Sequence, residues 1–165
     1  MQLVTEKSEL AHRKRILVAV DDSPRAVSVF DVGAEYARRL GAELYLLRTI
    51  TVPAEFPPAA ACSEQDPLPR RLSKIARQEI NAIAERAPDI SVIEKLVTFG
   101  LPGHMILEIA DMLRVDLIVL GSHGYKGWDR VLGTTAATIT NRSTHNVLVV
   151  HAGPTNGKQQ NEESH

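Results

Sequence analysis

The sequence ILVAVDDSP at residues 16–24 indicates how this chain of 165 residues folds. Its first five residues form a continuous apolar run, which is typical of a strand that is covered on both faces in a parallel sheet. Ser23 is a residue type that caps helices and Pro24 suits the first helical position, so we expect a helix to begin here. A buried strand that leads directly into a helix predicts an α/β fold.

The same alternation of a short apolar run with a helical pattern continues along the chain. Four further strands are expected, at residues 44–50, 92–99, 116–120 and 146–150. Helices are expected between the strands, at residues 24–40, 66–87, 102–113 and 134–142.

Strands that alternate with helices predict a single doubly wound, five-stranded parallel sheet with helices on both faces. The first and fourth strands are apolar on both faces, which places them in the middle of the sheet. The third strand alternates polar with apolar residues, as a strand at the margin of a sheet does. The strand order 3-2-1-4-5 satisfies these constraints.

Three segments are expected along the chain: a polar N-terminal extension at 1–14, an α/β domain at 15–151, and a disordered polar tail at 152–165. Residues 51–66 interrupt the alternation and carry three prolines, so we expect a long loop there.

Composition excludes several classes of protein. Nineteen basic residues against twenty acidic ones leave a formal charge of −1, without the basic surplus of a general nucleic-acid binder. No cationic amphipathic helix of the kind that binds membrane surfaces is expected. Cys62 is the only cysteine, which excludes an intramolecular disulfide and a cysteine zinc cluster. We therefore expect a soluble, cytoplasmic protein that has no structural metal and binds neither nucleic acid nor membrane.

The strand order predicts where a ligand would bind. The winding direction reverses between the first and fourth strands, and ligands of such sheets bind at the carboxyl ends of the strands at that reversal. Residues 21–23 follow the first strand and residues 121–124 follow the fourth. These two segments are therefore the candidate site.

A glycine-bearing segment follows the fourth strand: Gly121-Ser122-His123-Gly124, then eight residues, then Gly133-Thr134-Thr135 at the start of a helix. Glycines let the backbone approach an anion closely, and the first amides of a helix offer unpaired donors. The spacing predicts a phosphate-binding cradle. The alternative is a surface loop whose glycines serve turns.

Three stretches, RILVAVDDSP (15–24), DLIVLGSHG (116–124) and GTTAATITNRSTHNVLVV (133–150), resemble the universal stress protein family. The resemblance runs from about Arg15 to His151. It implies the five-stranded doubly wound fold and a homodimer formed through the last strand, Asn146 to Val150. Nucleotide-binding members carry Gly-x2-Gly-x9-Gly-Ser/Thr and bind ATP or a related adenine nucleotide such as AMP. Here Gly124 and Gly133 enclose eight residues, one fewer than in that pattern.

The resemblance also implies site residues, position by position. Asp21 matches an acidic residue that contacts the nucleoside, and a ribose hydroxyl is the expected partner. The nucleoside side of the site would comprise Ala19, Val20, Asp21, Thr49 and Leu120. The ribose and phosphate side would comprise Gly121, Ser122, Gly124, Gly133, Thr134 and Thr135. For Asp22 we favour a different role, as a cap of the first helix. The identity of the nucleotide and the presence of Mg²⁺ are left open.

The expected function is that of a regulatory binding module in the stress response, with an unidentified protein partner. The chain shows no set of nucleophile, base and orienting group, no metal-ligand spacing and no Walker lysine, so no catalytic residue is assigned. At most, slow ATP hydrolysis is expected.

Two other classes remain as alternatives. Asp21-Asp22 after the first strand resembles the acidic pair of a phosphoacceptor receiver domain, whose strand order is 2-1-3-4-5. A receiver needs an aspartate at the end of the third strand and a lysine after the fifth, where this chain has Thr98-Phe99-Gly100 and His151-Ala152. A nucleotide hydrolase or nucleotidyl transferase on a related fold would carry a serine- and glycine-rich loop directly after the first strand, which the chain lacks.

Overall fold

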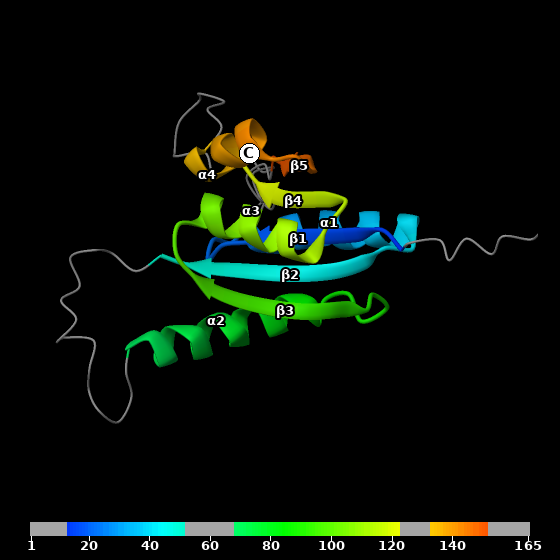
Figure 1. The fold of residues 1–165 in the computed structure, drawn as a ribbon. Helices are drawn as coiled ribbons and strands as arrows, with labels where there is room; N and C mark the ends of the chain where they lie inside the picture. Colours follow the sequence, from blue (N-terminus) through cyan, green and yellow to red (C-terminus); the bar gives the residue numbers. More distant parts are fainter. Residues whose placement is uncertain (1–12, 52–67, 123–132, 152–165) are drawn as a thin grey trace, which may run out of the picture.

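The computed structural model describes residues 13–51, 68–122 and 133–151. Its strands are β1 (Arg15–Val20), β2 (Glu43–Ile50), β3 (Val92–Phe99), β4 (Leu117–Gly121) and β5 (Asn146–Val150). Its helices are α1 (Ala26–Leu40), α2 (Leu68–Ala84), α3 (Pro102–Leu113) and α4 (Thr134–Arg142). All strand pairs are parallel, and the order β3-β2-β1-β4-β5 confirms the predicted sheet (Figure 1).

The central strand β1 positions the candidate site. It pairs with β2 on one side and with β4 on the other, and its last five residues are all buried. The chain winds from β1 through β2 to β3 in one direction, and from β1 it returns to β4 and β5 in the other. The carboxyl ends of β1 and β4 therefore lie next to each other at the point where the winding reverses.

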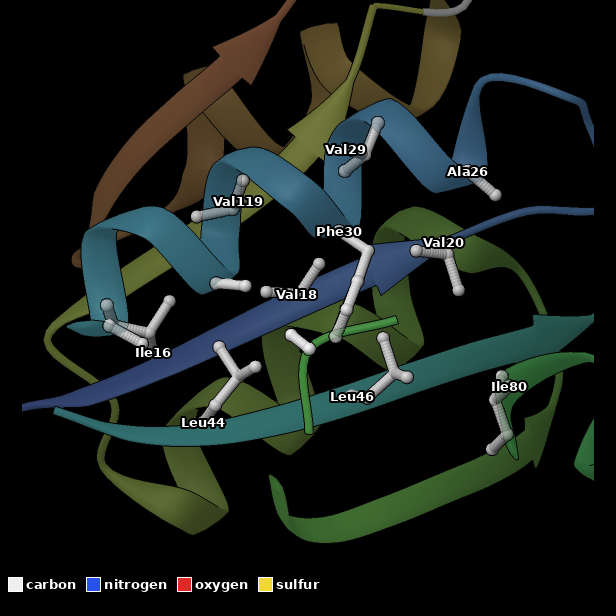
Figure 2. Close-up of a cluster of buried hydrophobic side chains, with 13 residues drawn as sticks. Ile16, Val18, Val20, Ala26, Val29, Phe30, Leu44, Leu46, Ile80 and Val119 are labelled. Carbon is white, nitrogen blue, oxygen red and sulfur yellow. The ribbon is translucent and has the colours of Figure 1, made fainter. Parts of the chain in front are cut away.

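Two apolar cores lie on opposite faces of the sheet. On one face, Ile16, Val18 and Val20 of β1 pack with α1 and α2, and Phe30 of α1 reaches over β1 toward Leu46 (Figure 2). On the other face, the alternate residues of β1 pack with α3 and α4. Phe30 is fully buried, and burial of a side chain of that size stabilises the fold by about 1.5–3 kcal/mol.

The start of α1 differs from the prediction. The helix begins at Ala26 rather than at Pro24, and no side chain caps it. Ser23 instead donates to Oδ1 of Asp21 twice, from its backbone N at 3.0 Å and from its Oγ at 2.6 Å. Such a side-chain turn competes with helix formation, so the chain leaves β1 through a tight turn before the helix starts.

Helix α2 also differs in part. It ends at Ala84 rather than at residue 87, and Ile75 is 50% exposed. In Figure 1 the start of α2 extends past the tip of β3. Ala76 and Ile80 are the buried residues of this helix.

Residues 1–12, 52–67, 123–132 and 152–165 lie outside the described residues, and with them lie most of the expected extension, loop and tail. No helix in the described part of the chain has the length and apolar character needed to cross a bilayer.

Candidate functional site

A pocket of about 620 Å³ opens at the carboxyl ends of β1, β2 and β4. Its walls come from the turn after β1, the first half of α2 and the N-terminal turns of α3 and α4. Pockets that bind small molecules commonly have volumes of about 300–1,000 Å³. The pocket lies where the winding of the sheet reverses, as the sequence predicts.

Nine of the eleven predicted site residues line this pocket: Ala19, Val20, Asp21, Thr49, Leu120, Gly121, Ser122, Thr134 and Thr135. They come from four segments of the chain, and the fold brings them together around one space. Gly133, the N-cap residue of α4, is described but does not line the pocket. Gly124 lies outside the described residues.

Two carboxylates follow β1, and the structure gives them different surroundings. Asp21 is half-buried, and Ser23 orients its carboxylate through the two hydrogen bonds described above. The side chain of Asp22 is 77% exposed, and its Oδ2 lies 3.4 Å from Nη2 of Arg48. The expected capping role of Asp22 is wrong, because Arg25 and not Asp22 occupies the N-cap of α1, and no described side chain caps this helix.

Backbone donors gather at the other end of the pocket. Gly133 is the N-cap residue of α4, and no side chain of the described residues caps this helix. The first amides of a helix have no partners within it and lie at the positive end of its dipole, which favours an anion nearby. Thr134 and Thr135 add hydroxyl groups at the same turn.

Gly121 allows β4 to approach α1 closely. A Cβ at this position would lie 3.1 Å from Cγ2 of Val29, which is tight for a side-chain contact. Close packing against α1 therefore favours glycine at this position of the pocket wall, whether or not a ligand approaches its backbone.

Sequence reasoning missed the side of the pocket formed by α2. Leu68, Leu72, Ile75 and Ala76 of that helix supply an apolar wall. Three further charged residues also line the pocket: Arg25 before α1, Arg48 of β2 and Glu79 of α2. The signal for Arg48 is visible in the sequence, since it is a lone charge inside the apolar run 44–50.

The arrangement separates two kinds of chemistry. Apolar side chains, three carboxylates and two arginines, Arg25 and Arg48, line the end formed by β1, β2 and α2. Hydroxyl groups lie at the end formed by β4 and α4, beside helix amides that no described side chain caps. Within residues 13–51, 68–122 and 133–151, no group of three or more His, Cys, Asp or Glu side chains is arranged to hold a metal ion. The pocket thus suits a ligand with an anionic end and an end that is largely uncharged.

Comparison with known proteins identifies the family. The model of the universal stress protein family matches residues 12–151. Universal stress protein A homolog 1 of Coxiella burnetii is 36% identical over 143 residues, which cover 84% of this chain and 96% of that protein.

Solved structures agree with this match. Universal stress protein UspA from Lactobacillus plantarum is 28% identical with a TM-score of 0.65, over 85% of this chain and 99% of that one. A universal stress protein crystallised in complex with cAMP is 26% identical with a TM-score of 0.60, over 84% of this chain and 97% of that one. The chain therefore belongs to the universal stress protein family.

Proposed function

We propose that the chain is a regulatory binding module of the stress response that holds an adenine nucleotide, ATP or AMP, in this pocket. The observation that carries the proposal is the meeting of the predicted nucleoside side and phosphate side around one pocket of about 620 Å³. The complex of a 26% identical relative with cAMP supports an adenine nucleotide as the ligand class.

The charges in the pocket favour one orientation of the ligand. Three carboxylates, Asp21, Asp22 and Glu79, outnumber the two cations Arg25 and Arg48 at the end formed by β1, β2 and α2, so this end disfavours phosphate groups. The first turn of α4 would attract them. The base would then lie against Ala19, Val20, Thr49 and Leu120, with the ribose hydroxyls near Asp21.

The receiver alternative does not fit the structure. Its expected strand order is 2-1-3-4-5, whereas the sheet has the order β3-β2-β1-β4-β5. The end of β3 carries Thr98 and Phe99, so the acceptor aspartate has no equivalent there.

Binding is tested by isothermal titration of the purified protein with ATP, ADP, AMP, adenosine and GTP. We expect the adenine ligands to bind and Asp21→Asn to weaken all of them by roughly 10-fold, since a hydrogen bond to a charged group contributes about 1.5–3 kcal/mol. Asp31→Asn is the matched control, because Asp31 pairs with Arg86 and does not line the pocket. Failure of every adenine ligand to bind the wild-type protein would disprove the proposal.

A further inference from the structure

Arg48 is a buried cation in the wall of the pocket. It lies near the end of β2, opposite Val20 of β1, and only 12% of its side chain is exposed. It follows Leu44 and Leu46 at alternate positions, so it belongs to the face of the sheet that α1 and α2 cover. An arginine in this place has to be paired, because burial of an unpaired charge is costly.

Three neighbouring groups surround its guanidinium. Nη1 donates to the backbone oxygen of Thr49 at 3.1 Å. Nη2 lies 3.4 Å from Oδ2 of Asp22, in the turn after β1, and Nε lies 3.6 Å from Oε2 of Glu79, on α2. A single side chain thus connects β2, the turn after β1 and helix α2, and all three charged residues line the pocket.

The geometry of these ion pairs is loose. Charge-assisted N–H···O bonds are usually about 2.7–2.9 Å long, and both carboxylates lie farther from Arg48 than that. Nε is buried and has no hydrogen-bond partner among the described residues. The side chains of both carboxylates are partly exposed, at 77% for Asp22 and 42% for Glu79. Arg48 is therefore the most buried of the three charged side chains and the one with which both carboxylates pair.

Removal of the guanidinium would change this wall in a defined way. Asp22 and Glu79 would then lose the cation with which both of them pair. Like charges repel, so the turn after β1 and helix α2 would separate. Leu72 and Ile75 would move away with α2, since both lie on the part of that helix that lines the pocket.

We propose that Arg48 is a positioning residue for the nucleoside end of the ligand. Its pairing with Asp22 holds the turn in which Asp21 faces the sugar, and its pairing with Glu79 holds the apolar wall of α2 against the base. This role rests on the proposed function. Arg48 then contributes to binding of the nucleoside, which adenosine, AMP and ATP share, and not to binding of the phosphates.

Dissociation constants of Arg48→Met for adenosine, AMP and ATP test this role. We expect all three constants to rise by the same factor, roughly 10-fold, as when one partner of a partly buried charge pair is removed. Arg86→Met is the matched control, because Arg86 pairs with Asp31 at 3.3 Å outside the pocket, and it should leave all three constants unchanged. A loss that grows with the number of phosphates would overturn the proposal and make Arg48 a phosphate-binding residue. Unchanged constants would also overturn it.

Hydrogen exchange of the ligand-free protein separates this proposal from the proposed function. We expect Arg48→Met to speed exchange in both residues 21–25 and the first half of α2. Asp22→Asn should affect mainly the turn, and Glu79→Gln mainly the helix. Asp22 and Glu79 are partly exposed, so these two substitutions also test the connection if Arg48→Met fails to fold. Each of them should raise the dissociation constants of adenosine, AMP and ATP by the same factor. If the wild-type protein binds no adenine ligand but these exchange patterns appear, the proposed function fails and the connection through Arg48 stands. Unchanged exchange in all three variants would overturn the connection itself.

Discussion

Gly33 lies in a tight contact between helix α1 and the central strand. A Cβ at this position would lie 2.4 Å from Cγ2 of Val18, and Val18 is fully buried. Real Cβ atoms do not approach other atoms so closely, and a β-branched side chain inside a strand has few alternative rotamers. The glycine therefore sets the distance between α1 and β1.

Gly33→Ala should destabilise the protein despite the better helix propensity of alanine. Propensity would contribute up to about 1 kcal/mol in favour of alanine, whereas overpacking of a well-packed core costs about 1–3 kcal/mol. We expect a net loss of about 1–2 kcal/mol, measured by urea unfolding. The double variant Val18→Ala/Gly33→Ala is the control. If the overlap is the cause, adding Gly33→Ala to Val18→Ala will cost much less than adding it to the wild-type protein.

At the level of single residues, sequence reasoning located the pocket but not its charged network. The residues at the ends of β1 and β4 could be placed because strand order alone determines which strand ends meet. The pairing of Arg48 with Asp22 and Glu79 could not, because it depends on where the turn after β1 and helix α2 lie relative to β2. The role of Asp22 was misjudged for a related reason: the Asp21–Ser23 turn delays the helix that Asp22 was expected to cap.

At the level of elements, the ends of α1 and α3 adopt the same backbone conformation with different residues. Gly41 ends α1 at φ 60° and ψ 33°, and Arg114 ends α3 at φ 51° and ψ 53°. Glycine adopts this left-handed conformation freely, whereas a residue with a Cβ is strained there. A Cβ at Gly41 would meet no atom within 4 Å, so any cost of substitution there comes from the backbone.

Substitutions at these two helix ends should change the free energy of unfolding in opposite directions. Gly41→Ala is expected to lower the free energy of unfolding by about 1 kcal/mol, and Arg114→Gly to raise it by up to about 1 kcal/mol. Urea unfolding of both variants measures the two changes. Gly41→Asn is the control, since asparagine tolerates this conformation and should cost less than alanine. Equal stability of Gly41→Ala and the wild-type protein would contradict the explanation.

Agreement between predicted and observed bounds does not follow burial. β3, α3, α4 and β5 have the predicted bounds, whereas the more buried strands β1, β2 and β4 each differ by one residue. Helix α2 was predicted least well. Its pocket-facing side chains have the spacing of a core stripe, and its outer face carries Arg70, Lys74 and Arg77, all exposed. It is thus a cationic amphipathic helix, contrary to expectation, although the whole chain carries a formal charge of only −1.

At the level of the whole molecule, the two edges of the sheet differ. The edge strand β3 carries exposed Glu94 and Lys95, and charges of this kind discourage pairing with another strand. The opposite edge, β5, has four apolar residues after Asn146, all half-buried. An apolar edge without charges invites pairing with a second copy of itself. We therefore propose that β5 forms the interface of a homodimer.

Val149→Pro should convert this dimer into a monomer. The oxygen of Val150 accepts a hydrogen bond from the backbone N of Ser122, so Val150 faces β4, and by alternation the N–H of Val149 points toward the open edge. Proline removes that donor while the β4–β5 hydrogen bonds remain. Leu148→Pro is the contrasting control, because the N–H of Leu148 points toward β4, so its loss removes a β4–β5 hydrogen bond and should destabilise the fold. Sedimentation equilibrium measures the mass of each variant against the chain mass of 18.1 kDa. A wild-type protein that stays at the mass of one chain at every concentration, or a folded Val149→Pro variant that stays dimeric, would rule out this interface.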